Sequence, residues 1–301
     1  MPFRRQTHRR RSPLGGLGPR IMIAAVIVIF SLVTYLTGTK KEENPVTGEM
    51  QRVGFNIEQG IALGLQSAPQ MAQQHGGDHP SVAAQRKVDE VGARLLRADP
   101  AVANSPFRFE FTLLRDDQTV NAFALPGGQI FITAALFKQF EKEDELAGVL
   151  GHEIGHVIDR HSAQQMAKSK LFSGIGTAII AATGGGGGGG GQMGAMVGQL
   201  LNTKYGRNDE LESDEWGVKL MYQAGFDPNA LVTVMEILER SAGGGGGPEF
   251  LSSHPSPKNR IAMIKQHIET YKDLARGGGV RAAARVQRAP EEGARLVIPG
   301  R

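Results

Sequence analysis

The stretch 143-EDELAGVLGHEIGHVIDRHSAQQ-165 decides how this 301-residue chain folds. Its apolar residues recur at spacings of three and four, which predicts an amphipathic helix with Asp144 near its start. Within it, His152-Glu153-Ile154-Gly155-His156 places two imidazoles one helical turn apart. Residues at positions i and i+4 share a helix face, so His152 and His156 can reach one tetrahedral cation.

Glu153 lies between the two histidines, on the adjacent stripe of the helix. A carboxylate there can take a proton from an attacking water, as it does where this motif serves a zinc hydrolase. The competing interpretation is a solvated helix face whose histidines and glutamate pair with neighbours. We favour the metal site because the five-residue pattern arises by chance in only about one sequence of this composition per hundred.

A catalytic zinc site needs a third protein ligand and an open position for water. His161 follows His156 by five residues, about 140° around a continuous helix, so we expect it off the metal face. Asp159 is close but poorly placed. The third ligand is therefore expected from another segment.

A second helical pattern starts near Glu210 and ends at Gly225. Glu210 and Asp214 share a face of this helix. One carboxylate can bind the metal while the other accepts the free ring N–H of a ligating histidine and fixes its tautomer. The alternative for Glu210 is a surface glutamate in an acidic stretch.

Four motifs resemble the zinc metallopeptidases that include the HtpX heat-shock protease, the CAAX prenyl proteases and the OMA-type mitochondrial protease (metallopeptidase family 48). They are 121-NAFALPGGQI-130, 150-LGHEIGH-156, 207-RNDELESD-214 and 254-HPSPKNRI-261. The third departs from the family pattern, which normally has Ala where this chain has Ser213. Together the motifs cover most of residues 55–270 in the family's order.

This resemblance implies an α+β, mainly helical fold: a thermolysin-like (gluzincin) zinc peptidase domain with a small antiparallel sheet, preceded by one transmembrane helix. It also implies one zinc ion per chain. The implied zinc ligands are His152, His156 and Glu210, and the implied catalytic residues are Glu153, Asp214, His254 and Arg260.

The resemblance leaves the roles of His254 and Arg260 open. His254 can stabilise the oxyanion of the tetrahedral intermediate or transiently occupy the open metal position; its alternative is a helix N-terminal histidine with no catalytic part. Arg260 can orient Asp214 or a substrate carbonyl, or be an ordinary surface arginine.

Residues Val120 to Phe131 predict two short strands joined by a tight turn at Pro126-Gly127-Gly128. An edge strand beside a zinc site can bind an extended peptide through main-chain hydrogen bonds, which depend little on the side chains of the peptide. We therefore expect a broadly specific endopeptidase. The alternative is a purely structural hairpin.

The N-terminus combines a basic tail with an apolar segment. Residues 1–20 contain six arginines and no acidic residue, and residues 21–38 contain no charge. Eighteen helical residues rise about 27 Å, close to the ~30 Å hydrocarbon core. We expect a single-pass inner-membrane anchor with the catalytic domain on the periplasmic or extracytoplasmic side. A cleaved signal peptide is the competing interpretation, although the cleavage pattern after Tyr35-Leu36-Thr37 is weak.

We divide the chain into a basic cytoplasmic tail, an anchor, a linker, a zinc metallopeptidase domain and a flexible tail. Their expected ranges are 1–20, 21–38, 39–54, 55–275 and 276–301. Before the predicted strands, Val53–Gln73 and Ser81–Leu96 show helical periodicity. His75 and His79, between them, are expected to be solvated loop residues. Segment 171–201, interrupted by a glycine run at 184–191, could be a lid over the cleft or an ordinary helix pair.

The amino-acid composition excludes several kinds of metal site, membrane anchor and binding partner. The chain has no cysteine, which excludes thiolate zinc ligands, disulfides and a lipoprotein anchor. The net charge of +4 is concentrated in the two tails, so we expect no nucleic-acid partner. The predicted function is a membrane-anchored zinc metalloendopeptidase that cleaves misfolded or unassembled envelope polypeptides in protein quality control. The alternative is a chaperone-like zinc protein that binds unfolded polypeptides with little catalysis. A prenyl-protein protease within the bilayer is disfavoured by the single apolar span.

Overall fold

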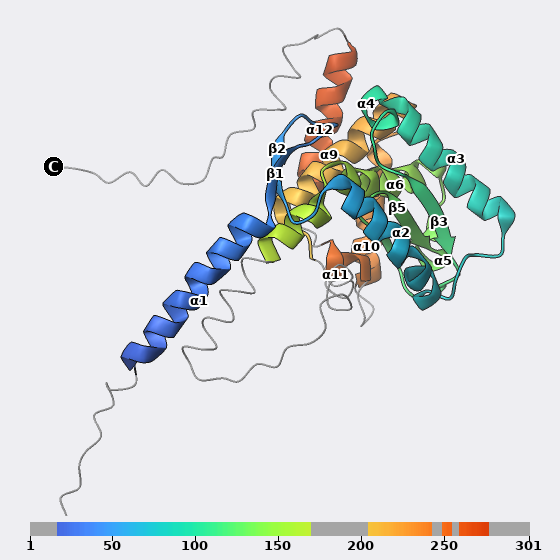
Figure 1. Cartoon of the computed structure of the whole chain (residues 1–301). Helices are drawn as coiled ribbons and strands as arrows, with labels where there is room; N and C mark the ends of the chain where they lie inside the picture. Colours follow the sequence, from blue (N-terminus) through green and yellow to red (C-terminus); the bar gives the residue numbers. More distant parts are fainter. Residues whose placement is uncertain (1–16, 170–203, 243–248, 255–258, 277–301) are drawn as a thin grey trace, which may run out of the picture.

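A computed structural model describes residues 17–169, 204–242, 249–254 and 259–276 (Figure 1). Its helices are α1 Leu17–Gly38, α2 Ile57–Gln74, α3 Val82–Ala98, α4 Pro100–Ala103, α5 Ala134–Phe137, α6 Glu143–Ile158, α9 Arg207–Ala224, α10 Asn229–Ala242, α11 Glu249–Ser253 and α12 Arg260–Ala275. Its strands are β1 Lys40–Glu43, β2 Met50–Val53, β3 Glu110–Leu114, β4 Ala122–Ala124 and β5 Gln129–Thr133. The predicted lid at 171–201, the glycine runs and nearly all of both tails lie outside the described residues.

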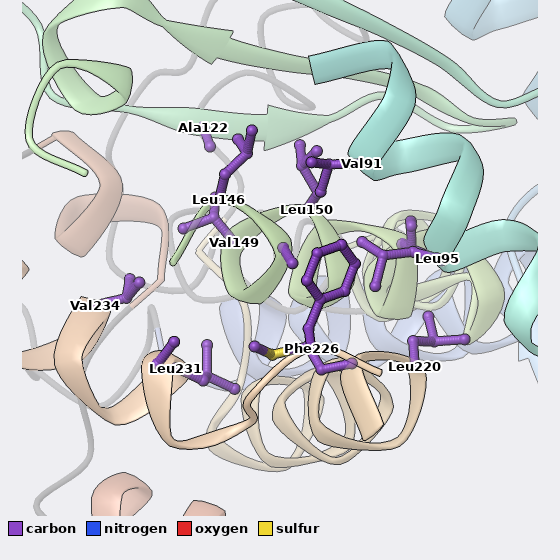
Figure 2. Close-up of a cluster of buried hydrophobic side chains, with 14 of the residues drawn as sticks. Val91, Leu95, Ala122, Leu146, Val149, Leu150, Leu220, Phe226, Leu231 and Val234 are labelled. Atoms are coloured by element: carbon purple, nitrogen blue, oxygen red, sulfur yellow. The ribbon is translucent and has the colours of Figure 1, made fainter. Parts of the chain in front are cut away.

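Helix α6 is the centre of the fold. Every residue from Glu145 to Ile158 is buried, so the helix is enclosed on all sides rather than amphipathic as expected. Figure 2 shows Leu146 and Leu150 of α6 between the sheet, with Ala122 of β4, and the segment that carries Phe226 and Leu231. Burial of these apolar side chains stabilises the fold by about 1.5–3 kcal/mol for each large one.

Asp144 lies in the first turn of α6, as expected, where it accepts a hydrogen bond from the backbone N–H of Asp227. Glu145 accepts those of Glu141 and Lys142. The other end differs from the prediction: the helix stops at Ile158 instead of continuing to residue 165, and a new helical segment begins at 161.

The main sheet has the strand order β3-β5-β4. Strand β4 pairs antiparallel with β5 through the predicted Pro126-Gly127-Gly128 turn, and it forms one edge. Strand β3 pairs parallel with β5, so the expectation of an antiparallel sheet is wrong for this pair. Gly127 has φ +92°, and a Cβ there would lie 2.4 Å from Cα of Ile61 on α2. The turn therefore needs glycine both for its backbone conformation and for the close approach of α2.

Residues 39–54, expected as a linker, form an antiparallel hairpin of β1 and β2. The Asn44 side chain in its turn donates to the carbonyl of Ile158, 2.8 Å away, at the end of α6. Arg160 donates to Glu42 of β1 at 2.9 Å. Because these contacts are to residues that directly follow the His152–His156 motif, the hairpin is part of the folded domain.

Helix α1 occupies the expected anchor position and projects away from the rest of the fold (Figure 1). Within the described part of the chain, no helix is long and apolar enough to cross a membrane. The anchor at 21–38 is therefore not confirmed.

The remaining predictions from periodicity agree with the structure. Helices α2 and α3 lie where two helical patterns were expected, and α9 ends at Gly225, which has φ +75° as a left-handed cap. Helices dominate the described elements, and the sheets are small, which confirms the α+β, mainly helical class.

Candidate metal centre

Close contact between α6 and α9 builds the site. A Cβ at Gly151 would lie 3.1 Å from Cα of Gly217, and one at Gly155 would lie 2.9 Å from Cα of Ser213. Only helices that present glycines at the crossing can approach so closely. This approach places the acidic first turns of α9 directly against the two histidines of α6.

The structure brings together the three predicted metal ligands. Nε2 of His152 lies 3.1 Å from Nε2 of His156, and the Glu210 carboxylate oxygens lie 3.7 Å and 3.5 Å from these two nitrogens. All three residues are buried. Together with His254 they form a group whose donor atoms lie within 4.8 Å of one another.

This donor set fits a zinc ion. Tetrahedral ligands bound at 2.0–2.1 Å lie about 3.3 Å from one another, and the observed separations of 3.1–3.7 Å bracket that value. Two imidazole nitrogens and one carboxylate are also a known catalytic zinc set. Asp159, the weaker sequence candidate, is not in this group.

Asp214 and Arg260 hold the ligands in place. Nδ1 of His152 lies 2.9 Å from Asp214 Oδ1, so this nitrogen donates and Nε2 keeps its lone pair for a metal. Arg260 donates twice to Asp214, at 2.8 Å and 2.7 Å, and once to Glu210, at 2.7 Å. Burial opposes ionisation of Asp214, but Arg260 lowers its pKa to about 2. Two carboxylates and one guanidinium leave a net negative charge that suits a cation.

Glu153 is buried, and neither of its carboxylate oxygens has a side-chain hydrogen-bond partner among the described residues. Burial raises its pKa, partly offset by His254, His152 and the backbone N–H of Ala124. A buried carboxylate with so few partners is costly, and such groups are typical of functional sites.

His254, from the end of α11, inserts its ring among the ligands. Its Nδ1 lies 3.1 Å from Glu210 and 3.4 Å from Nε2 of His152, while its Nε2 lies 3.6 Å from Glu153. Burial opposes protonation, but the Glu210 and Glu153 carboxylates raise the pKa of His254. Of the two roles left open by the sequence, this position favours occupation of the fourth metal position.

A cleft of about 260 Å³ opens beside the cluster. Its walls include Phe123 and Ala124 of β4, Tyr205 and His254. Edge strand β4 therefore borders a space that reaches His254, the fourth member of the candidate metal group. His75 lies on the turn after α2, as expected, but it lines the cleft and pairs with Asp116 at 2.9 Å, so it is not the solvated side chain that was predicted.

Two neighbours of His156 were not predicted. Tyr205 stacks on the His156 ring, with 4.0 Å between centroids, and burial raises the pKa of its hydroxyl. His161, expected off the metal face, has its Nδ1 2.9 Å from Nδ1 of His156. The prediction assumed a continuous helix, but the chain turns at residues 159–160 and His161 starts a new one. No pattern in the sequence pointed to Tyr205.

Comparison with known proteins agrees with this geometry. Peptidase family M48 matches residues 83–268, more than half of the chain. The chain is 32% identical over 199 residues to the beta-barrel assembly-enhancing protease of Escherichia coli, covering 62% of this chain and 39% of that protein. It is 38% identical over 178 residues to the mitochondrial metalloendopeptidase OMA1 of Schizosaccharomyces pombe, covering 58% of this chain and 52% of that protein. The match thus spans about two fifths to one half of each relative.

Proposed function

We propose that this chain, which belongs to Peptidase family M48, is a zinc metalloendopeptidase that hydrolyses peptide bonds in unfolded polypeptides. The observation that carries the proposal is the buried cluster of His152, His156 and Glu210 beside a buried carboxylate, Glu153, that has no side-chain hydrogen-bond partner in the described structure. A merely structural zinc site would have no use for such a carboxylate.

Each residue of the site has its own role in the proposed reaction. A zinc ion held by His152, His156 and Glu210 would supply Lewis-acid activation of the attacking water and the scissile carbonyl. Glu153 takes a proton from that water and later delivers it to the leaving amine. Asp214 keeps His152 in its ligating tautomer through their 2.9 Å hydrogen bond.

The cleft supports an extended polypeptide as substrate. Strand β4 pairs with β5 on one side, and it is the outer strand of the β3-β5-β4 sheet. A substrate strand paired with its open edge would lie across the front of the ligands, because Ala124 and His254 line the same cleft. Main-chain pairing recognises extended conformation more than sequence, which suits cleavage of misfolded chains.

The proposal extends to the cellular setting. We infer that α1 attaches the domain to the inner membrane, with the catalytic domain on the periplasmic side and misfolded or unassembled envelope proteins as substrates. The support is the exposed apolar side chains of α1, including Met22 at 65% and Ile29 at 62% exposure, and the basic residues that precede them. One relative is named for enhancing β-barrel assembly, which is consistent with substrates of this kind.

The test is cleavage of casein by the purified full chain with zinc, beside the Glu153→Gln variant. We expect only the native chain to cut, with equal zinc content in both proteins, because Gln keeps the shape of Glu153 but cannot accept the proton. Cleavage by the variant would refute the role of Glu153. Zinc binding without cleavage by either protein would instead favour a closed site or a polypeptide-binding protein.

A further inference from the structure

Arg160 has φ +57°, and it is the one non-glycine residue with positive φ in the described structure. Such a backbone conformation is strained for a residue with a side chain and persists only when the surroundings hold it. Here the guanidinium donates to Glu42, at 2.9 Å, and to the backbone carbonyl of Phe55, at 3.1 Å. The surroundings thus fix a sharp turn between the catalytic helix and the next one.

This turn brings a third histidine against the metal ligands. His161, the first residue after Arg160, is fully buried, and its Nδ1 lies 2.9 Å from Nδ1 of His156. Its other nitrogen, Nε2, lies 3.0 Å from the carboxylate of Glu212 on α9. The three side chains form one continuous line from the metal cluster to Glu212, whose side chain is 55% exposed.

The direction of these hydrogen bonds follows from the ligand geometry. His156 points Nε2 towards His152 and Glu210, so in the metal-bound site its Nδ1 carries the proton and donates. Nδ1 of His161 must then accept, and the hydroxyl of Ser213, 3.4 Å away, can donate to the same nitrogen. A neutral imidazole that accepts at Nδ1 donates at Nε2, here to the Glu212 carboxylate.

The same reasoning excludes another use of these residues. Asp159, His161 and Glu212 also lie close enough together to hold a metal ion. A second ion there would need the lone pair of His161 Nε2. That nitrogen is protonated whenever His156 serves the first ion, so the two uses of His161 are incompatible.

We propose that His161, oriented by Glu212, is a positioning residue that fixes the tautomer and ring orientation of the ligand His156, as Asp214 does for His152. This inference rests on the proposed zinc site. Outer hydrogen-bond partners of ligating histidines typically change metal affinity by about 10–100-fold when they are lost. The turn at Arg160 is explained by the same role, because a continuous helix would carry His161 away from His156.

The test is the zinc dissociation constant, measured by competition with a chelator, for the full chain and three variants. His161→Phe keeps the ring shape without nitrogens, and we expect it to weaken zinc binding about 10–100-fold. His161→Asn places an amide oxygen near the position of Nδ1, and we expect it to restore much of the affinity. Glu212→Ala removes only the outer carboxylate, which water can replace, so we expect a loss of a few-fold.

Controls separate positioning from folding and from failure of the zinc site itself. The His161 variants should change the free energy of unfolding of the zinc-free protein, measured with urea, by less than they change the free energy of zinc binding. Glu236→Ala replaces an exposed glutamate on α10 and should leave both quantities unchanged. Equal zinc affinity of the native chain and His161→Phe would overturn the inference. If His161→Phe does not fold, equal affinity of Glu212→Ala and Glu236→Ala would overturn it. A native chain that binds no zinc would instead refute the proposed function.

Discussion

The Nδ1 of His254 lies 3.1 Å from Glu210 and 3.4 Å from His152, so in the proposed zinc site its ring would take the position that a substrate carbonyl needs. A hydrogen bond to a charged group contributes about 1.5–3 kcal/mol, so removing the ring should open the site. We expect His254→Ala to cleave casein about tenfold faster or more, in line with 1.4 kcal/mol per tenfold. The rate of peptide release in the presence of zinc measures this.

The other role of His254 has the opposite consequence. If its imidazole stabilises the oxyanion, His254→Ala would lower kcat by about 10²–10³-fold. A variant that cleaves more slowly than the native chain while binding zinc equally would therefore reject the closed-site interpretation.

Glu215, on α9, should make stability depend on pH. Burial raises its pKa to about 7 from an ordinary value of 4.5, with Glu212 and Glu49 adding to the effect against Lys219. Between these values the folded state keeps a proton that the unfolded state releases, so the free energy of unfolding falls as pH rises from about 4.5 to 7. Glu215→Gln should remove on the order of 2 kcal/mol of this fall.

Urea unfolding between pH 4.5 and 8 with a chelator present, so that zinc release does not contribute, checks this prediction. Burial also raises the pKa of Asp159 to about 7. The Glu215→Gln variant should therefore keep part of the dependence of unfolding free energy on pH. The exposed Glu236→Gln is the matched control. A slope identical in Glu215→Gln and the native chain would contradict the expectation.

Which residues form the site followed largely from sequence, because His152, Glu153 and His156 carry a local motif and the family resemblance supplied Glu210, Asp214, His254 and Arg260. What each distal residue touches followed only in part. Asp214 was one of the expected partners of Arg260, but nothing in the sequence pointed to Glu210, to which the same guanidinium also donates.

At the scale of elements, the crossing of α6 and α9 controls the ligand geometry, and Gly155→Ala tests it. The added Cβ would lie 2.9 Å from both Cα of Ser213 and Cβ of Trp216, so the helices must separate. We expect a loss of about 1–3 kcal/mol of stability and weaker zinc binding, because Glu210 moves away from the histidines. Urea unfolding and chelator competition measure the two effects.

Gly148→Ala is the control on the same helix. The nearest atoms to a Cβ there, all of Leu231, lie 3.3–3.5 Å away, and alanine favours helix by up to about 1 kcal/mol over glycine. Its stability should therefore be close to that of the native chain or higher. Equal losses of stability in the two variants would mean that a methyl group added anywhere on this buried helix, rather than at the crossing with α9, explains the result.

The predictability of elements depended on whether their cause is local. Apolar spacing and the Pro126-Gly127-Gly128 turn are local signals, and helices α2, α3 and α9 and the hairpin of β4 and β5 lie where they were predicted. The parallel pairing of β3 and the break at Arg160 are not local. The break is held by Glu42 and Phe55, more than 100 residues earlier in the chain, so the sequence around His161 read as one continuous helix.

At the scale of the whole molecule, the described structure leaves many apolar side chains of α1 exposed. Val26 is 61% exposed and Ile29 is 62% exposed, and the helix projects away from the fold (Figure 1). Exposed apolar side chains at this spacing lie on one helix face and indicate a surface that meets another apolar phase. Attachment to a membrane and catalysis should therefore be separable.

We expect the full chain to float with phospholipid vesicles and the double variant Val26→Asp/Ile29→Asp to stay in the aqueous fraction. If α1 inserts into the bilayer as proposed, each aspartate near its centre costs about 2.5–3.5 kcal/mol, enough together to reduce binding by more than a thousandfold. The control pair Met50→Asp/Val82→Asp changes two equally exposed apolar residues of the domain, at 64% and 71% exposure, and should still float. Casein cleavage should persist in both pairs, because neither touches the metal centre. If the α1 variant still floats, attachment lies elsewhere in the chain, and the position of the catalytic domain relative to the membrane must be argued from that other surface.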